Sequence, residues 1–337
     1  FFDKINRKLR IYKIWTNTGG LILFSLITGF FILGYTDVNF QIILMKGDNF
    51  PIVLMIYSMF FFTWYAMKKS YINDARIEKG EKPTEYHDPE DKVLVWPDLV
   101  YIELIALILF MVFLIVWSIL VQAPLEEPAN PASTPNPSKA PWYFLGLQEM
   151  LVYFDPWLAG VVFPTFIILG MCAIPYMDIN KKGAGYYSFK ERRVGYFIFM
   201  YGWLVLWVYL IIIGTFFRGP NWNFFGPFEY WDIHKVVPLN NINLSEYFWV
   251  IGLGQPLPQN ILIRESAGFL ITGLYLLVLP VILAKTLLKN MYQRYGPIRF
   301  TFLMILGLSM LSLPIKMYLR WIFNLKYIIG IPEWFFN

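Results

Sequence analysis

A loop between two long apolar segments carries the side chains best suited to exchange protons. It contains Pro-Trp-Tyr-Phe-Leu at positions 141–145, followed by Glu149 and, where the next apolar segment begins, by Asp155. A positioned carboxylate can accept a proton from a bound hydroxyl group, and a tyrosine hydroxyl can hydrogen-bond to it. If residues 142–151 form a short helix, Glu149 lies about two turns beyond Pro141 and on a similar face. Glu149 and Tyr143 are therefore the residues of this loop with side chains suited to proton exchange. The alternatives are a solvated loop carboxylate or a contact with a neighbouring subunit.

The chain has two histidines and one cysteine, which limits the cofactors that it can hold. A b-type haem between transmembrane helices needs two axial side chains, usually histidines, that face the bundle interior. His87 and His234 both fall in predicted loops, so we expect no bis-histidine haem in this chain. His234 alone is weak evidence for a metal site. With Cys172 as the single cysteine, covalent c-type haem attachment and disulfides within the chain are excluded. We interpret Cys172 as a small packing residue.

The elements that must position this loop are transmembrane helices. The 337 residues are 57% hydrophobic and 20% aromatic but only 15% charged, which is far outside the range of soluble domains. Runs of roughly 20 apolar residues are long enough to cross a bilayer as a helix. They predict an all-α integral membrane protein with about seven transmembrane helices. The expected spans are residues 19–35, 50–66, 99–121, 157–177, 194–216, 267–288 and 300–319.

Basic residues alternate between the loops and thereby predict the orientation of the helices. Lys and Arg gather before the first predicted span and after the second, fourth and sixth, whereas Lys46 and Lys139 stand alone in the first and third intervening loops. The positive-inside rule then places the N-terminus on the negative, cytoplasmic side and the loop with Trp142 on the positive side. Topology explains the net charge of +5 without a nucleic-acid partner. Secondary transport is disfavoured, because we find no paired interrupted helices and few charges at mid-membrane.

The middle of the chain resembles the C-terminal part of cytochrome b, called subunit IV where that protein is divided, from bc-type quinol-oxidising complexes. The resemblance includes the order of spans and basic loops as well as short motifs. These motifs are Pro-Ala-Asn-Pro at 128–131, Thr-Pro at 134–135, Trp-Tyr-Phe at 142–144, Ile-Pro-Tyr at 174–176 and Arg-Arg at 192–193. Pro141 departs from the pattern, because the family has a glutamate at this position.

The resemblance suggests three blocks along the chain. Residues 1–95 hold two extra N-terminal spans and a charged inner loop. Residues 96–216 form a three-helix core like that of subunit IV. Residues 217–337 hold an aromatic outer loop and two C-terminal spans. We interpret the aromatic segment at 218–232 as a belt at the lipid headgroup level, with a docking surface for an electron carrier as the alternative.

What the resemblance implies is a quinol oxidation site on the positive side of the membrane. There one electron passes to a Rieske iron-sulfur protein and one to a b haem. The implied ligand is a quinone or quinol, either menaquinone or ubiquinone. The implied partners are a haem-bearing subunit like the N-terminal half of cytochrome b, the Rieske protein and a c-type cytochrome, in a dimeric multi-subunit complex. The residues expected to bind the quinone are Pro141, Trp142, Tyr143, Phe144, Leu145 and Asp155.

The missing family glutamate is thought to accept the quinol proton, and Pro141 cannot do so. Glu149 is therefore the expected replacement. A second quinone site near the negative face is also implied, with Asp178, Lys182 and Arg192 as the nearest charged residues. The alternative is that these three residues are positive-inside anchors and charges at helix ends.

These observations predict a subunit of a membrane quinol:cytochrome c oxidoreductase that is active only with its partners, in a bacterial inner membrane. It would couple electron transfer to proton release. The alternative is a structural membrane anchor of a respiratory or photosynthetic assembly without quinol chemistry. The lost glutamate favours the anchor, whereas the retained Trp142-Tyr143 loop favours a working site.

Overall fold

The computed structural model describes residues 11–87, 94–121, 128–180, 185–238 and 240–331. Within these ranges the chain is helical, and its β-structure is limited to two isolated bridges. Seven helices are long and apolar enough to cross a membrane, and each overlaps one predicted span. They cover Asn17–Gly34, Gly47–Glu78, Val95–Leu120, Leu158–Met177, Arg193–Phe217, Ser266–Lys285 and Lys289–Phe323. The predicted all-α membrane fold is confirmed, and the orientation of the N-terminus stays a prediction.

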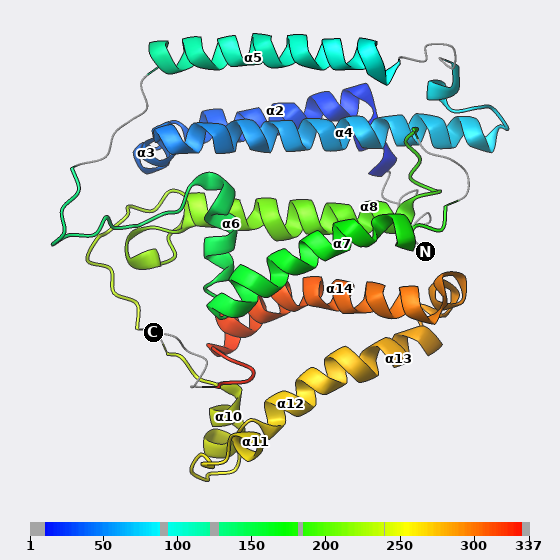
Figure 1. The fold of residues 1–337 in the computed structure, drawn as a ribbon. Helices are drawn as coiled ribbons and strands as arrows, with labels where there is room; N and C mark the ends of the chain where they lie inside the picture. Colours follow the sequence, from blue (N-terminus) through cyan, green and yellow to red (C-terminus); the bar gives the residue numbers. More distant parts are fainter. Residues whose placement is uncertain (1–10, 88–93, 122–127, 181–184, 239, 332–337) are drawn as a thin grey trace. The chain divides into compact units, whose positions relative to one another are not determined.

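The chain divides into two compact units, whose ribbons can be followed in Figure 1. Unit 1 comprises Phe1–Ser138, Gly183–Tyr196 and Gly226–Trp231, and unit 2 comprises Lys139–Lys182, Phe197–Phe225 and Asp232–Asn337. The units group residues by contact, whereas the three sequence blocks group them by resemblance. The division into three blocks therefore stays a prediction.

Unit 1 is built on two antiparallel helices, α2 (Asn17–Gly34) and α4 (Phe50–Glu78). The indole Nε1 of Trp64 donates hydrogen bonds to the carbonyl oxygens of Ile14 at 3.1 Å and Thr16 at 3.2 Å. Further along the pair, the Phe31 and Tyr57 rings lie 5.9 Å apart. The other helices of this unit are η1 (Ile11–Trp15), α3 (Val38–Met45), η2 (Gly47–Asn49), η3 (Thr84–His87), η4 (Val95–Leu99) and α5 (Val100–Leu120).

A polar network fastens two loops to the C-terminal part of α4. Asn73 donates to Glu85 Oε2 at 2.7 Å and to the carbonyl of Tyr187 at 2.9 Å. Asp74 accepts from Ser188 Oγ at 2.6 Å. Asn73 and Asp74 are buried, so these bonds satisfy groups that would otherwise be costly to remove from water. Thr84 and Glu85, in the charged loop after the second span, are thereby bonded to α4.

Unit 2 contains the fourth, sixth and seventh spans, the fifth span from Phe197 onward, and the outer loop apart from Gly226–Trp231. α8 (Arg193–Met200) begins in unit 1 and ends in unit 2. The other helices are α6 (Trp142–Met150), η5 (Leu158–Val162), α7 (Phe163–Met177), η6 (Tyr201–Val208), α9 (Tyr209–Ile212), η7 (Ile213–Phe217), η8 (Pro220–Trp222), α10 (Leu244–Glu246), η9 (Tyr247–Gly252), α11 (Ile261–Arg264), α12 (Ser266–Gly273), η10 (Leu274–Val278), α13 (Leu279–Lys285) and α14 (Lys289–Phe323).

The core of unit 2 joins the turn after α6 to the fifth and seventh spans. Its buried members are Tyr153, Leu210, Ile213, Leu313 and Met317. The side chain of Lys316 is also buried, and its Nζ donates to the carbonyl oxygens of Leu325 at 2.8 Å and Lys326. The segment after α14 is thus tied back onto that helix.

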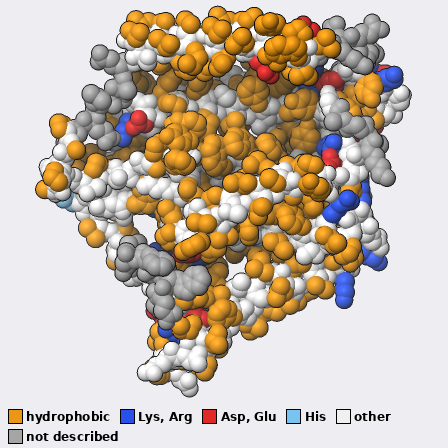
Figure 2. All heavy atoms as spheres, viewed as in Figure 1, with side chains coloured by type: hydrophobic (Ala, Val, Ile, Leu, Met, Phe, Trp, Pro, Cys, Tyr) orange, Lys and Arg blue, Asp and Glu red, His pale blue; other side chains and the backbone are white. Residues whose placement is uncertain are grey.

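The helix surfaces are apolar, as Figure 2 shows for the visible face. The most extreme case is α5, in which no residue is buried. Exposed apolar side chains are unfavourable in water but favourable in the hydrocarbon core of a membrane. The burial pattern therefore agrees with a protein that spans the bilayer.

Candidate functional site

Helix α6 has two faces of opposite character. Leu145, Gly146 and Glu149 are buried, whereas the side chains of Tyr143 and Phe144 are 50% and 54% exposed. Leu145 and Gly146 precede Glu149 by four and three positions, so all three lie on one side of the helix. This face packs against α9 and η7 at the end of the fifth span. Gly214 permits the close approach, because a Cβ atom there would lie 2.8 Å from Leu145 Cγ.

Helix α6 begins with three aromatic residues in succession, of which Tyr143 and Phe144 are exposed and Trp142 is half-buried. Trp142 and Tyr143 have ring centroids 5.7 Å apart, and Tyr143 and Phe144 have centroids 4.8 Å apart, both with an edge-to-face arrangement. Such pairs hold each other in a preferred geometry. We call Trp142, Tyr143 and Phe144 the aromatic edge of α6. It offers flat apolar surfaces and one hydroxyl group to a ligand.

The start of α6 is fixed to the rest of unit 2 by polar contacts. The backbone N–H of Ala140 donates to Gln148 Oε1 at 2.7 Å, which folds the preceding loop back along the helix. The Nζ atom of Lys139 donates to the carbonyl oxygen of Thr215 at 3.0 Å. Pro141 is the N-cap residue and is exposed. The aromatic edge therefore begins from an anchored position.

On the buried side, Glu149 is the centre of a polar cluster. Arg218 binds it with two nitrogens, Nε to Oε2 at 3.0 Å and Nη2 to Oε1 at 2.8 Å. The indole Nε1 of Trp222 donates to Oε2 at 3.2 Å, and the hydroxyl of Tyr153 donates to Oε1 at 2.8 Å. We call Glu149, Tyr153, Arg218 and Trp222 the Glu149 cluster. Each carboxylate oxygen accepts two hydrogen bonds, which is a favourable arrangement for a buried carboxylate.

The electrostatics of the cluster favour a charged arginine and a neutral tyrosine. Burial acts to lower the pKa of Arg218, but its hydrogen bonds to Glu149 and the negative charge of that residue outweigh burial, so the pKa is raised. Burial raises the pKa of Tyr153, and the adjacent charge of Glu149 raises it further. Tyr153 is therefore a hydrogen-bond donor at physiological pH. The cluster ties α6 to the segment that follows the fifth span.

The predicted catalytic pair, Tyr143 and Glu149, is not brought together. Six positions separate them, which places them about 120° apart around the helix. Tyr143 lies on the exposed face and Glu149 on the buried face. Asp155 accepts a hydrogen bond from the backbone N–H of Trp157 at 3.2 Å. Leu145 is buried on the opposite side of α6, where it packs against Gly214. The roles given to these residues stay predictions.

Of the three residues predicted for a negative-side site, the structure describes Asp178 and Arg192. Asp178 is exposed, and its carboxylate accepts from the backbone N–H of Asn180 at 2.9 Å. It belongs to unit 2, whereas Arg192 belongs to unit 1. Lys182 lies outside the described residues. This site also stays a prediction.

Sequence reasoning missed Arg218, Tyr153 and Trp222 as partners of Glu149. One signal was present, because Arg218 directly follows the fifth span on the predicted positive side, where cations are scarce. An arginine at such a position is favourable when a carboxylate is near it. Tyr153 lies four positions after Glu149, which is the spacing of neighbours on one side of a helix. The sequence alone did not indicate which carboxylate Arg218 would contact.

Among the residues that the structure describes, no group of three or more His, Cys, Asp or Glu side chains could hold a metal ion. His234 lies in the outer loop with an exposed side chain, and its backbone N–H donates to Asp232 Oδ1 at 2.9 Å. Nothing in the described part of this chain resembles a haem-binding group.

Comparison with known proteins locates a family relationship in the middle of the chain. The family described as cytochrome b (C-terminal)/b6/petD matches residues 128–228. The matched segment contains the aromatic edge, all four residues of the Glu149 cluster, and the fourth and fifth spans. No solved structure matches the chain. The predicted resemblance to the C-terminal part of cytochrome b is confirmed for this segment.

Proposed function

Because residues 128–228 match the C-terminal cytochrome b family, we propose that this chain is a membrane subunit of a bc-type complex whose α6 forms part of the quinol oxidation site. The observation that carries the proposal is the division of α6 into an anchored buried face and an exposed aromatic edge. A quinone ring is flat and apolar, and aromatic side chains are typical of sites that bind such ligands.

Each residue of the aromatic edge has a separate task in this proposal. The rings of Trp142 and Phe144 bind the quinone ring, and the hydroxyl of Tyr143 hydrogen-bonds one quinol oxygen. Electrons leave to a b haem on a partner subunit like the N-terminal half of cytochrome b and to a Rieske protein, which passes its electron to a c-type cytochrome. The complex would lie in a bacterial inner membrane, with menaquinone or ubiquinone as its substrate.

The proton acceptor in this proposal is Glu149. In the arrangement described, both of its carboxylate oxygens are occupied by donors. To accept a quinol proton, Glu149 must first lose a donor, and Trp222 makes the longest of the four contacts at 3.2 Å. The competing role is that of a positioning residue, which holds α6 through Arg218 without touching the quinol.

A conservative substitution in the aromatic edge tests the proposal. In the assembled complex, Tyr143→Phe keeps the ring and removes the hydroxyl group. A lost hydrogen bond of about 1 kcal/mol corresponds to a roughly fivefold slower reaction. Quinol oxidation, followed as haem reduction after rapid mixing, is therefore expected to slow by that factor. Tyr176→Phe is the matched control, because Tyr176 is exposed at the end of α7 and should leave the rate unchanged.

The second candidate function is a structural anchor without quinol chemistry. Two observations favour it, namely Pro141 in place of an acceptor and the full engagement of Glu149 by Arg218, Tyr153 and Trp222. Under this function, Tyr143→Phe and Tyr176→Phe would oxidise quinol at the same rate as the unaltered complex.

A further inference from the structure

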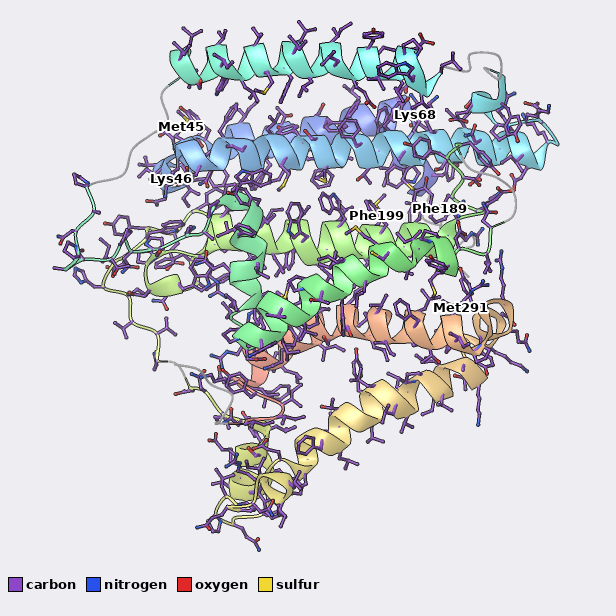
Figure 3. The ribbon with its side chains drawn as sticks, in the orientation of Figure 1. Met45, Lys46, Lys68, Phe189, Phe199 and Met291 are labelled. Atoms are coloured by element: carbon purple, nitrogen blue, oxygen red, sulfur yellow. The ribbon has the colours of Figure 1, made fainter. Side chains whose placement is uncertain are left out.

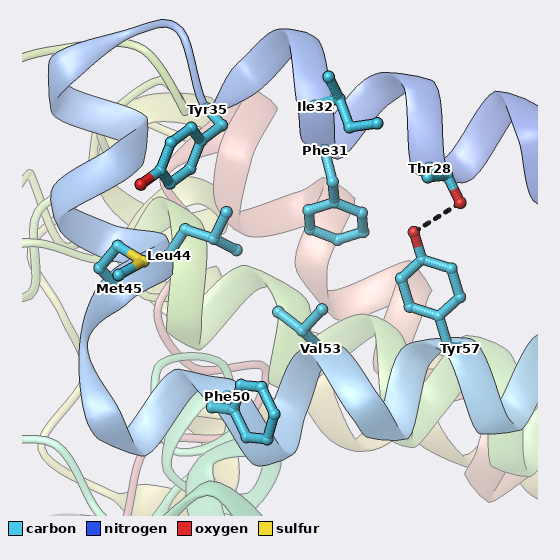
Figure 4. Close-up of a pocket in the computed structure, with 9 residues that line it drawn as sticks. All are labelled: Thr28, Phe31, Ile32, Tyr35, Leu44, Met45, Phe50, Val53 and Tyr57. Carbon is cyan, nitrogen blue, oxygen red and sulfur yellow. Dashed lines mark hydrogen bonds between the residues drawn. The ribbon is translucent and has the colours of Figure 1, made fainter.

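The N-terminal spans form an open cavity of about 420 Å³ at the corner where α2, α3 and α4 meet (Figure 4). Its volume falls within the range of small-molecule sites in proteins. It lies wholly within unit 1 and outside the family match at residues 128–228. Most of its wall is apolar, with two residues from each helix, namely Phe31, Ile32, Leu44, Met45, Phe50 and Val53.

The corner that forms the cavity is held by α3. Asp37 caps this helix and accepts from the backbone N–H groups of Asn39 and Phe40 at 3.0 Å. At the other end, Asn49 Nδ2 donates to the carbonyl of Ile43 at 2.6 Å. The ring of Phe40 is buried against Gly34, where a Cβ atom would lie 2.7 Å from it. With Phe40 and Ile43 buried, α3 is fixed and Leu44 and Met45 line the cavity.

The interior of the cavity suits a hydrocarbon chain. Two of its hydroxyl groups bind each other, because the Tyr57 hydroxyl donates to Thr28 Oγ1 at 2.9 Å. Figure 4 shows this bond on the wall, with apolar side chains along the remainder. An apolar cavity does not retain water. From Thr28 to Tyr35 the wall follows α2 for about 10 Å, so an acyl chain entering from the helix end can lie along it.

The rim of the cavity carries one charge of each sign. The loop between Met45 and Phe50, both of which line the cavity, contains Lys46 and Asp48. Lys46 Nζ and Asp48 Oδ2 lie 3.9 Å apart, and both side chains are exposed. Figure 3 shows Met45 and Lys46 together at one end of α4 and Lys68 towards its other end. The charges therefore lie at an end of the second span, where lipid headgroups would be.

We propose that this cavity binds one acyl chain of a phosphatidylethanolamine-type lipid, with Lys46 on its phosphate and Asp48 on its ammonium group. A zwitterionic headgroup matches the pair of opposite charges. A primary ammonium donates hydrogen bonds to a carboxylate, whereas the quaternary ammonium of phosphatidylcholine has no N–H group to donate. The tyrosine hydroxyl of Tyr35 lies at the same rim.

Lipid exchange on the purified complex tests the proposal. The detergent-washed complex is incubated with vesicles of equal phosphatidylethanolamine and phosphatidylcholine with identical chains, repurified, and its lipids quantified by mass spectrometry. Exposed charge pairs make small contributions, so the unaltered complex should retain phosphatidylethanolamine with a roughly two- to fivefold preference. Lys46→Gln combined with Asp48→Asn should still retain lipid, but in the proportions of the vesicles.

The cavity itself is tested by filling it. Val53→Trp places a large ring in the cavity and should lower the retained lipid by one molecule per chain. Its matched control is Leu54→Trp, because Leu54 is the next residue on α4, is 60% exposed and does not line the cavity. Equal retention by Val53→Trp and Leu54→Trp would overturn the proposal. So would the absence of a headgroup preference in the unaltered complex, or a copurifying quinone that Val53→Trp displaces in place of phospholipid.

Discussion

At the level of single residues, the bidentate contact between Glu149 and Arg218 determines how the site can operate. Arg218 is 8% exposed and Glu149 is fully buried. Removing one member of such a pair leaves the other charge buried and unpaired. The free-energy cost of that unpaired charge is far larger than the net stabilisation from the intact pair. The contact therefore makes α6 sensitive to both residues, whichever of them takes part in chemistry.

We expect Arg218→Met to destabilise the outer part of unit 2, because Glu149 would remain buried without its counter-charge. The expected loss is about 3 to 5 kcal/mol, measured as a lower thermal unfolding midpoint of the detergent-solubilised protein. Adding Glu149→Gln to this variant should recover part of the loss by removing the unpaired charge. Arg294→Met is the control, because Arg294 is exposed. A midpoint for Arg218→Met equal to that of the control would contradict the prediction.

Glu149→Gln separates the two roles of the carboxylate. If Glu149 accepts the quinol proton, turnover of the assembled complex should fall by about 10²- to 10⁴-fold with normal haem content. If it only positions α6, the rate per assembled complex should stay near normal while assembly or thermal stability falls. Rates measured from pH 5 to 9 give a second readout, since loss of a proton acceptor changes the pH profile and loss of a support does not.

At the level of elements, α6 explains what the sequence could and could not predict. The argument about Glu149 assumed a short helix at 142–151, and α6 covers Trp142–Met150. The face that it buries depends on Arg218, which lies 69 positions away, so periodicity within the loop could not reveal it. Helix α3 was also missed. Its eight residues, Val38–Met45, are too few to span a membrane, and their apolar run gave no separate signal.

The network around Glu85 should make the inner loop sensitive to acid. Burial acts to raise the pKa of Glu85, but hydrogen bonds from its own backbone, Asn73 and Thr84, with the charge of Lys69, lower it overall. A lowered pKa in the folded state means that the stabilisation is present above the ordinary value of 4.5 and is lost as pH falls through the folded value. For this partly exposed group the effect should stay below about 1 kcal/mol.

Hydrogen exchange can detect the loss of this stabilisation as local opening of the loop around Glu85. Amides at Thr84 and Glu85 should exchange faster at pH 3.5 than at pH 6 after correction for intrinsic rates. Glu85→Gln should abolish most of the difference. Glu81→Gln is the matched control, because Glu81 is exposed and its Oε2 lies 3.6 Å from Arg76 Nε. An equal pH response in both variants would rule out Glu85 as the titrating group.

At the level of the whole molecule, the seven spans were predictable because length and hydropathy alone define them. The arrangement of the spans was not predictable, because it depends on buried contacts such as those of Tyr153 with Leu313 and Met317. The family match at residues 128–228 contains the fourth and fifth spans and leaves the first, second, third, sixth and seventh outside it.

The alternation of basic loops predicts the sidedness of the molecule, which cysteine labelling can test. In a Cys172→Ser background, Asn130→Cys should react with an impermeant maleimide added from the positive side of intact cells or vesicles. Gln293→Cys, near the start of α14 and before the predicted span at 300–319, should react only after access to the negative side. Both positions are exposed. Labelling of both from one side would overturn the topology.

Helix α5 has a consequence for the way this polypeptide tolerates change. None of its residues is buried, and its mean hydropathy of 3.0 exceeds that of the other six spans. Membrane helices first insert into the bilayer and then pack against one another. Because α5 buries no residue against the rest of this chain, its stability here comes from insertion into the bilayer. Exchanging one aliphatic residue of α5 for another should therefore be nearly neutral for the stability of this chain. The bilayer requires residues 100–120 to stay apolar. Any further constraint on their identity would come from a subunit that contacts this helix.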